Sequence, residues 1–282
     1  MNSNINRLDR LIRSAILEDM PHGDVTTVSI VDRGQSASAV LFTKQESVIC
    51  GLEVAKRVFQ KLDKNARVKF FVKDGQKVKK NTKVLTVNGR VQALLSAERT
   101  ALNFLSYLSA IATKTRRFTE AIRPYKAHIL DTRKTTPTLR FLERYAVRCG
   151  GGRNHRDNLS EMAMIKDNHL LCIGGRSIKD VVSQLRKKKN VAVEVEVDTL
   201  KQFRDALEST ADIILLDNMP SADIQKAVKL RNKLKKSILL EVSGGVDLKN
   251  VKRYAQTGVD RISIGALTHS REAIDFSMEV IP

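Results

Sequence analysis

Basic side chains gather in one short segment of the sequence. The segment DTRKTTPTLR contains Arg133, Lys134 and Arg140 together with several threonines. Guanidinium, ammonium and hydroxyl groups are the donors that proteins use to bind carboxylates and phosphates. A basic surface loop is the simpler interpretation. Because the segment directly follows an apolar stretch that is typical of a β-strand, we favour an anion-binding site.

Two further segments add cations. The segment CGGGRNHR (149–156) places three glycines before His155 and Arg156, and glycines let backbone amides approach an anion closely. The segment MIKDNHL (164–170) places Lys166 at the end of an expected strand. A lysine there could form a Schiff base with a carbonyl substrate or pair with an acidic ligand.

Acidic residues alternate with valines in the segment VEVEVD. The two-residue period of a strand puts Glu194, Glu196 and Asp198 on one face. Asp217 follows the next apolar stretch. Glu196 and Asp217 on neighbouring strands could hold Mg²⁺ and substrate hydroxyls, because carboxylate oxygens are the ligands that Mg²⁺ prefers. A buried salt bridge to Lys166 is the alternative.

Two glycine-containing turns complete the set. The turn SGG consists of Ser243, Gly244 and Gly245, and the segment GALTHS begins at Gly265 and leads into an expected helix. Backbone N–H groups at such turns bind phosphate, and α/β barrels often hold a phosphate after their last two strands.

The second half of the chain alternates short apolar segments with amphipathic ones, which predicts parallel strands joined by helices. The chemically active residues fall at the carboxyl ends of these strands, where barrel enzymes place their sites. An incomplete α/β barrel is favoured over an open doubly wound sheet, because no GxGxxG or GxxxxGK[ST] motif occurs. The expected strands cover 127–131, 162–166, 191–197, 212–217, 237–242 and 261–265.

The first half of the chain has a different pattern of apolar residues. Residues 36–91 show short strand-like stretches with DG and NG dipeptides as hairpin signals, and a long helix is expected over about 92–122. We therefore predict an N-terminal α/β domain over 1–112, a barrel over 113–270, and a C-terminal helix over 271–282 that returns to the first domain.

Composition limits the class of protein. The chain has 282 residues, of which 42% are hydrophobic, and three cysteines without metal-ligand spacing. It lacks a membrane-spanning stretch and a signal-peptide pattern, so a cytoplasmic protein is expected. The formal net charge of +19 indicates a polyanionic partner. Nucleic acid is the less favoured one, since aromatic residues make up only 5%.

Taken in order, ERTALNFLSYLSAIAT, DTRKTTPTLR, RCGGGRNHR, MIKDNHL, VEVEVD, LLDNM, EVSGG and ISIGALTHS resemble the quinolinate phosphoribosyltransferase family, also called carboxylating nicotinate-nucleotide pyrophosphorylases. The resemblance runs from GDVTT near residue 23 to the C-terminus. It implies an N-terminal α/β sandwich followed by an incomplete, seven-stranded α/β barrel. It also implies a Mg²⁺-dependent reaction of quinolinate with phosphoribosyl pyrophosphate, which yields nicotinate mononucleotide, pyrophosphate and CO2 for NAD biosynthesis.

The resemblance implies roles for individual residues. Quinolinate contacts fall on Arg133, His155, Arg156 and Lys166, with Lys134 in the same basic pocket. Arg99 matches an arginine supplied by the partner subunit of a homodimer, or of a hexamer built from dimers. Glu196 and Asp217 match the acids near the ribose and Mg²⁺. Lys134, Lys166, Glu196 and Asp217 are therefore the expected catalytic residues, and the phosphate loops match Ser243, Gly244, Gly245 and Gly265.

Two departures from the family pattern stand out: Thr138 replaces a usual glycine, and Pro21-His22 precedes GDVTT. Two other functions remain open at this point. One is the related pyrophosphorylase associated with molybdenum transport, and the other is a basic nucleic-acid-binding protein.

Overall fold

The computed structural model describes residues 2–172, 174, 176–234 and 237–281. These residues form two compact units. The first unit contains residues 1–114, 148–150 and 271–282, and the second contains 115–147 and 151–270. No helix within the described residues is both long and apolar enough to cross a membrane.

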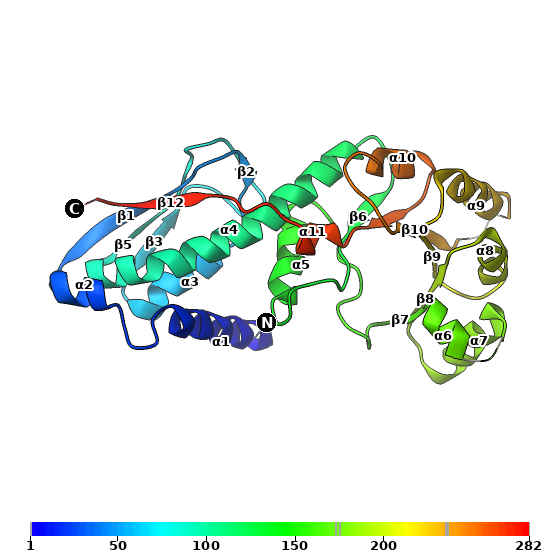
Figure 1. Cartoon of the computed structure of the whole chain (residues 1–282), viewed down its shortest axis with the longest axis horizontal. Coiled ribbons are helices and arrows are strands. Elements are labelled where there is room, and N and C mark those ends of the chain that lie inside the picture. The colour runs from blue at the N-terminus through cyan, green and yellow to red at the C-terminus, as the bar shows by residue number, and fades with distance from the viewer. Residues whose placement is uncertain (1, 173, 175, 235–236, 282) are drawn as a thin grey trace. The chain divides into compact units, whose positions relative to one another are not determined.

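The first unit is built on a four-stranded antiparallel sheet with the strand order β12-β1-β5-β3 (Figure 1). A separate two-stranded pair joins β2 to β4. The strands are β1 (Ser36–Thr43), β2 (Ser47–Val48), β3 (Arg67–Phe70), β4 (Lys77–Val78), β5 (Lys83–Arg90) and β12 (Phe276–Ile281), and the helices are α1 (Asn2–Asp19), α2 (Val25–Ile30), α3 (Leu52–Leu62) and α4 (Val91–Ala121).

Helix α3 packs its apolar side chains into the core of this unit. Val54, Ala55, Val58 and Phe59 are all buried, at the three- and four-residue spacing of one helix face. The helix begins after Gly51, whose φ of +104° suits a residue without a Cβ. Helix α4 matches the long helix expected over 92–122, and it is unbroken.

Two expectations about the first unit are wrong. The C-terminal segment forms strand β12, not a helix, because β1 offers an open edge to which residues 276–281 hydrogen-bond from Thr43↔Phe276 to Ser38↔Ile281. The NG dipeptide, Asn88-Gly89, lies inside β5 and makes no hairpin turn, because β5 continues there in pairing with β1.

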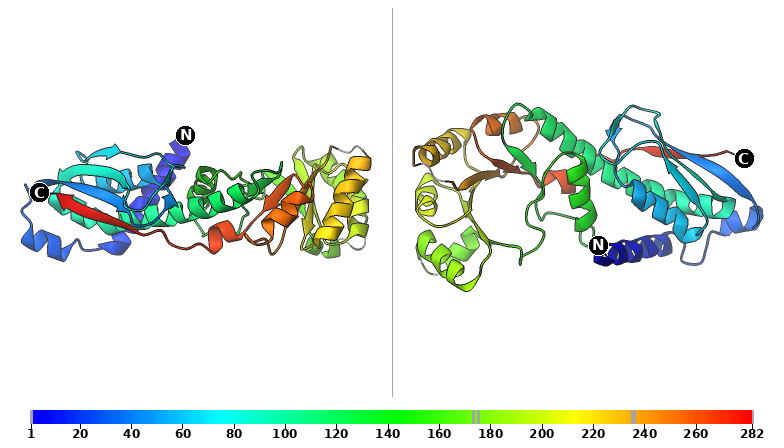
Figure 2. Two further views of the ribbon diagram at one scale, coloured as in Figure 1. Left: turned by 90° about the horizontal axis from the view of Figure 1, so that it is seen from above. Right: turned by 180° about the vertical axis from the view of Figure 1, so that it is seen from behind.

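The second unit contains a six-stranded parallel sheet with helices along its outer face, seen in green to orange in Figure 2. The strands are β6 (His128–Leu130), β7 (Met162–Ile165), β8 (Ala192–Val197), β9 (Ile213–Asp217), β10 (Leu239–Ser243) and β11 (Arg261–Ser263). The helices are α5 (Arg140–Cys149), α6 (Asp167–Cys172), α7 (Ile178–Lys188), α8 (Leu200–Leu207), α9 (Ser221–Lys233), α10 (Val251–Gln256) and α11 (Ala266–His269), and the last two residues of α5 belong to the first unit.

The strand order β6-β11-β10-β9-β8-β7 shows how this sheet curls. The first strand pairs with the last one, as in a barrel, and this excludes the open doubly wound alternative. The sheet stays open between β6 and β7, where a single parallel bridge joins Arg153 to Leu130. The fold class, an α/β sandwich with an incomplete α/β barrel, is confirmed. Within the described residues the sheet has six strands plus this bridge, so the seventh strand implied by the resemblance is reduced to one residue pair.

Candidate active site

A cavity of about 570 Å³ opens in the second unit at the carboxyl ends of the parallel strands. Strands β7 to β11 and the loop after β6 all contribute to its wall. Its lining residues are Thr132, Arg133, Lys134, His155, Arg156, Met164, Lys166, Glu196, Leu215, Asp217, Glu241, Ser243, Gly244, Gly245, Val246, Ser263, Ile264, Gly265, Ala266 and His269.

Every predicted site residue except Arg99 lines this cavity. Arg99 is an exposed residue of α4 and belongs to the first unit. Three other residues considered from the sequence also lie outside the lining: Arg140, Asp198 and Glu194. Arg140 donates to Thr135 Oγ1 at 2.9 Å and to the Asp157 carbonyl at 2.8 Å, so it links the loop before α5 to the loop after it. Asp198 lies beyond the end of β8 and is exposed.

The basic side of the cavity holds two arginines. Arg133 presents a buried Nε that has no hydrogen-bond partner within the described residues. Arg156 donates from Nη1 to the Met162 carbonyl at 2.9 Å. Burial and the neighbouring charge of Arg133 lower the pKa of Arg156. Two cations that lie this close, one with an unsatisfied N–H, are suited to binding an anion with more than one carboxylate.

Asp131 connects the loop after β6 to the segment 154–156 through hydrogen bonds. It is fully buried, and it accepts hydrogen bonds from the His155 backbone N–H at 2.7 Å and from Asn154 Nδ2 at 2.5 Å. Burial raises the pKa of this carboxyl. Because the same side chain follows β6 and holds the 154–155 backbone, it fixes Arg133 and His155 relative to each other.

His155 sits in a buried cluster with two glutamates. Its Nε2 lies 3.1 Å from Glu194 Oε2 and 3.2 Å from Glu241 Oε1. Arg261 Nε pairs with Glu241 Oε2 at 2.6 Å and partly offsets the two acidic groups. The backbone N–H of Arg156 donates to His155 Nδ1 at 2.7 Å, which requires Nδ1 to carry no proton.

This cluster binds a proton more tightly than its members would alone, because the pKa values of two of its groups are raised. Burial lowers the pKa of His155, but the facing Glu194 and Glu241 outweigh burial and raise the pKa to about 9. Burial likewise raises the pKa of Glu194. Since Nδ1 accepts this hydrogen bond, the imidazole proton lies on Nε2 between the two glutamates, and the further proton belongs to the cluster of His155, Glu194 and Glu241 as a unit.

On the acidic side, Lys166 Nζ pairs with Glu196 Oε2 at 2.5 Å. A salt bridge to Lys166 is the alternative to a Mg²⁺ site that the sequence leaves open. This salt bridge is present, and both of its residues line the cavity. Asp217 lies at the end of the neighbouring strand β9 and accepts from Asn218 Nδ2 at 2.8 Å. Two carboxylates on adjacent strands at one cavity wall are a suitable oxygen donor set for Mg²⁺.

The two glycine loops are shaped by close contacts. Gly244 has a φ of +93°, and a Cβ there would lie 2.0 Å from Asn218 Oδ1, so only glycine fits. A Cβ on Gly265 would lie 2.9 Å from Lys134 Cδ, so this glycine makes room for the Lys134 side chain. The helix that follows Gly265, α11, has only four residues.

Some of the polar residues that line the cavity are not among those predicted from the sequence. Glu241, Thr132, Ser263 and His269 also line the cavity. Glu241 carried a usable signal, because it lies two residues before Ser243 on β10 and therefore on the same face of the strand. Thr132 follows β6, Ser263 ends β11 and His269 ends α11, and no spacing in the sequence singles them out.

Comparisons with known proteins extend these observations. The family model described as the C-terminal domain of quinolinate phosphoribosyl transferase matches residues 111–279, and the model of the N-terminal domain matches 24–109. A nicotinate-nucleotide pyrophosphorylase [carboxylating] from Mycobacterium leprae is 41% identical over 273 residues, which are 95% of each chain. A mitochondrial quinolinate phosphoribosyltransferase [decarboxylating] from Nicotiana glauca is 37% identical, and the match covers 97% of this chain and 82% of the relative.

A solved structure agrees with both sequence comparisons. The nicotinate-nucleotide pyrophosphorylase from Francisella tularensis superimposes with a TM-score of 0.93 at 40% sequence identity. The superposition covers 98% of this chain and 96% of that one. Sequence and architecture are therefore similar over both units.

Proposed function

This chain belongs to the quinolinate phosphoribosyltransferase family, and from that premise we propose which of its residues carry out the reaction. It transfers a phosphoribosyl group from phosphoribosyl pyrophosphate to quinolinate, with loss of CO2, and so forms nicotinate mononucleotide, a precursor of NAD. The observation that supports the residue roles is the cavity itself, which brings a cationic wall and an acidic wall together at the strand ends.

Quinolinate binds at the cationic wall. Its two carboxylates need paired donors, and Arg133 Nε is a buried donor that lacks one acceptor. Arg156, His155 and Lys166 line the same wall. Together these groups orient the pyridine nitrogen toward the anomeric carbon of the sugar and so lower the entropic part of the barrier.

The phosphoribosyl donor binds across the glycine loops. Backbone groups of Gly244 and Gly245, the Ser243 hydroxyl and the Lys134 ammonium face the space where its 5′-phosphate and pyrophosphate would lie. As the bond to pyrophosphate breaks, positive charge develops on the ribose. Glu196 and Asp217 stabilise that charge from the acidic wall.

Mg²⁺ fits the same carboxylates, Glu196 and Asp217, and when bound it supplies positive charge that neutralises the leaving pyrophosphate. Lys166 pairs with Glu196 in this structure, so Glu196 must exchange partners when it takes that role. A lysine held as an ammonium in this ion pair is not a nucleophile, and we infer no Schiff-base intermediate. Trapping of a Lys166 adduct with borohydride would contradict this inference.

After transfer, the pyridine nitrogen carries a positive charge. When the adjacent carboxylate leaves as CO2, the electron pair of the broken C–C bond stays on the ring carbon, where the neighbouring positive charge stabilises it until a proton from solvent takes the place of the carboxylate. The decarboxylation therefore needs no organic cofactor. The arginines that hold the carboxylates keep the substrate in register during this step.

We further propose a homodimer, or a hexamer of dimers, in which Arg99 reaches the partner's cavity; its exposure on α4 supports this role. A cytoplasmic location is proposed from the cysteine pattern.

The test is an assay with quinolinate, phosphoribosyl pyrophosphate and Mg²⁺ that reads nicotinate mononucleotide. Product formation that depends on all three is expected. Activity without Mg²⁺, or with nicotinate in place of quinolinate, would contradict the proposed roles.

A further inference from the structure

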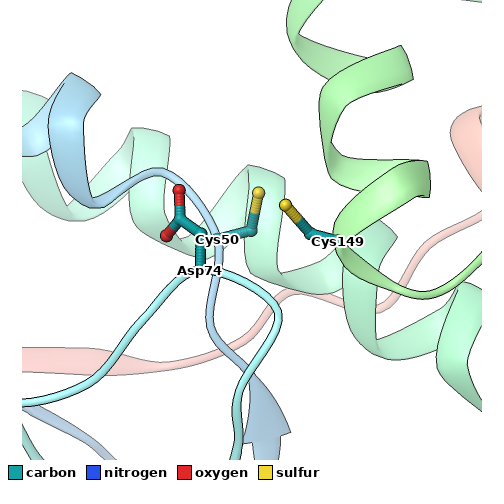
Figure 3. Close-up of side chains that lie close together, drawn as sticks. All are labelled: Cys50, Asp74 and Cys149. Atoms are coloured by element: carbon teal, nitrogen blue, oxygen red, sulfur yellow. The ribbon is translucent and has the colours of Figure 1, made fainter.

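Two cysteines of the first unit face each other, and neither of them lines the cavity. Cys50 follows β2 and is completely buried, and Cys149 ends α5 and is half-buried. Their sulfur atoms and a carboxylate oxygen of Asp74 all lie within 4.8 Å of one another. Figure 3 shows the two thiols pointing toward each other, with the Asp74 carboxylate on the far side of Cys50.

The backbone holds both cysteines in place. The Cys50 N–H donates to Ser109 Oγ at 2.9 Å, and that hydroxyl donates to the Cys50 carbonyl at 3.2 Å. Gly75 donates to the carbonyl of Ile49 at 2.8 Å. A Cβ on Gly75 would lie 3.1 Å from the Cys149 carbonyl oxygen, so the 75 loop presses directly on the Cys149 backbone.

The surroundings favour a dithiol over a metal site. Asp74 Oδ1 already accepts hydrogen bonds from the N–H groups of Gly51 and Leu52, at 3.1 and 3.2 Å, where α3 begins. The contact with Cys149, burial and the Asp74 charge raise the pKa of Cys50, while the nearby Arg148 opposes the shift. A divalent cation would need both thiols to lose their protons, and it would compete with the hydrogen bonds that Asp74 accepts from Gly51 and Leu52.

We propose that Cys50 and Cys149 are an oxidative modification site, at which a low-molecular-weight disulfide such as oxidised glutathione converts the two thiols into an intrachain disulfide. The half-buried Cys149 is the entry point. Its thiolate attacks one sulfur of the oxidant, forms a mixed disulfide and releases one thiolate. Cys50 then loses its proton and attacks the Cys149 sulfur, which releases the second thiolate. The oxidant takes up both electrons as two molecules of its thiol.

The third cysteine supplies a matched control. Cys172 lies at the end of α6, is exposed, and belongs to the second unit. Replacing it (Cys172→Ser) leaves a full-length protein with only the facing pair. The protein is incubated with oxidised glutathione, denatured, alkylated and weighed by mass spectrometry, and a digest is searched for the peptide that links residues 50 and 149.

The expected result is a loss of two hydrogen atoms, no alkylation, no bound glutathione, and a linked peptide that disappears on reduction. In Cys50→Ser, Cys172→Ser the resolving thiol is missing, so glutathione stays attached to Cys149. The single variant decides the question even where the double variant does not fold.

Two results would overturn the proposal. In the first, both thiols of the Cys172→Ser protein remain fully alkylated after exposure to oxidised glutathione, or the protein keeps glutathione on Cys149 without forming the link. In the second, Zn²⁺ binds the reduced protein at one equivalent and protects both thiols, while oxidised glutathione leaves them reduced. The second result would assign the cluster to a metal instead.

Discussion

At the scale of single residues, the site depends on a few charged groups whose partners lie on other strands. Asp131 orients the backbone of His155, and Glu194 and Glu241 enclose its ring. Such buried charges are costly unless they are compensated, and here each acid faces a cation or a donor. Substitutions within this network should therefore affect both catalysis and stability.

Removing one cation from the substrate wall should lower activity. For Arg133→Ala or Lys134→Ala we expect kcat/KM to fall by an amount equivalent to about 2–5 kcal/mol of transition-state stabilisation, the usual cost of deleting one partner of a charge pair that bound substrate shields from water. Steady-state kinetics with quinolinate varied measures this loss. Lys179→Ala, an exposed cation on α7, is the control and should keep wild-type activity. Wild-type turnover in both cavity variants would show that the pocket is misassigned.

The proton retained by the His155 cluster predicts an alkaline loss of stability. The pKa of His155 is raised above its ordinary 6.5 to about 9, so the folded state binds more protons than the unfolded chain between these values. Its contribution is present below pH 6.5 and is lost as pH rises toward 9. Glu194→Gln removes one of the two carboxylates that raise the pKa of His155 and should flatten this dependence.

Thermal unfolding measured from pH 6 to 9 tests this prediction. Glu208→Gln, at an exposed helix end, should retain the wild-type slope. Equal slopes in Glu194→Gln and wild type would contradict a proton held by the cluster.

At the scale of elements, the sequence predicts the parallel strands and the residues at their ends, but it predicts neither the His155 cluster nor strand β12. Alternating apolar segments predicted β6 to β11, and the residues after them do gather at one cavity. The His155 cluster could not be foreseen, because it joins β8, β10 and a loop whose register only the folded sheet defines. Residues 276–281 form strand β12 and not the expected helix, since their pairing with β1 settles their conformation.

The loop after β6 contains a testable case of backbone strain. Thr138 has a φ of +69°, in the left-handed region that a β-branched residue avoids, at the position where the resemblance expects glycine. Thr138→Gly should be more stable than Thr138→Ala by about 1 kcal/mol, because both lose the hydroxyl and only alanine keeps the strained Cβ. Urea unfolding compares the two variants. A more stable alanine variant would show that the loop relaxes.

At the scale of the whole molecule, the two units match two family domains, and the proposed dimer makes them interdependent. Lys166→Ala removes a residue of the cavity, and Arg99→Ala removes one that we assign to the partner. Coexpression of the two variants should produce hybrid dimers with one intact site. Random pairing then restores about a quarter of wild-type activity. If the separately inactive variants recover nothing together, each cavity is complete within one chain.

The net charge of +19 also acts at this scale. The chain has 50 lysines and arginines, and among the residues that the structure describes Arg133, Lys134, Arg156 and Lys166 are the ones that line the cavity. The remaining positive charge should attract the polyanionic substrates over several ångströms, and salt screens such attraction. We expect the KM for phosphoribosyl pyrophosphate to rise as NaCl increases from about 50 to 500 mM. A constant KM over that range would contradict steering by the surface.

The pairing of β12 with β1 has a consequence for the folding of this protein during its synthesis on the ribosome. Strand β1 emerges early, but the strand that covers its edge is translated only after the entire barrel. Throughout that interval the nascent sheet exposes a row of unpaired amides and carbonyls, which is the surface at which chains aggregate. An expression fragment that stops before residue 276 would keep that edge permanently, so the sandwich is best produced with the barrel attached.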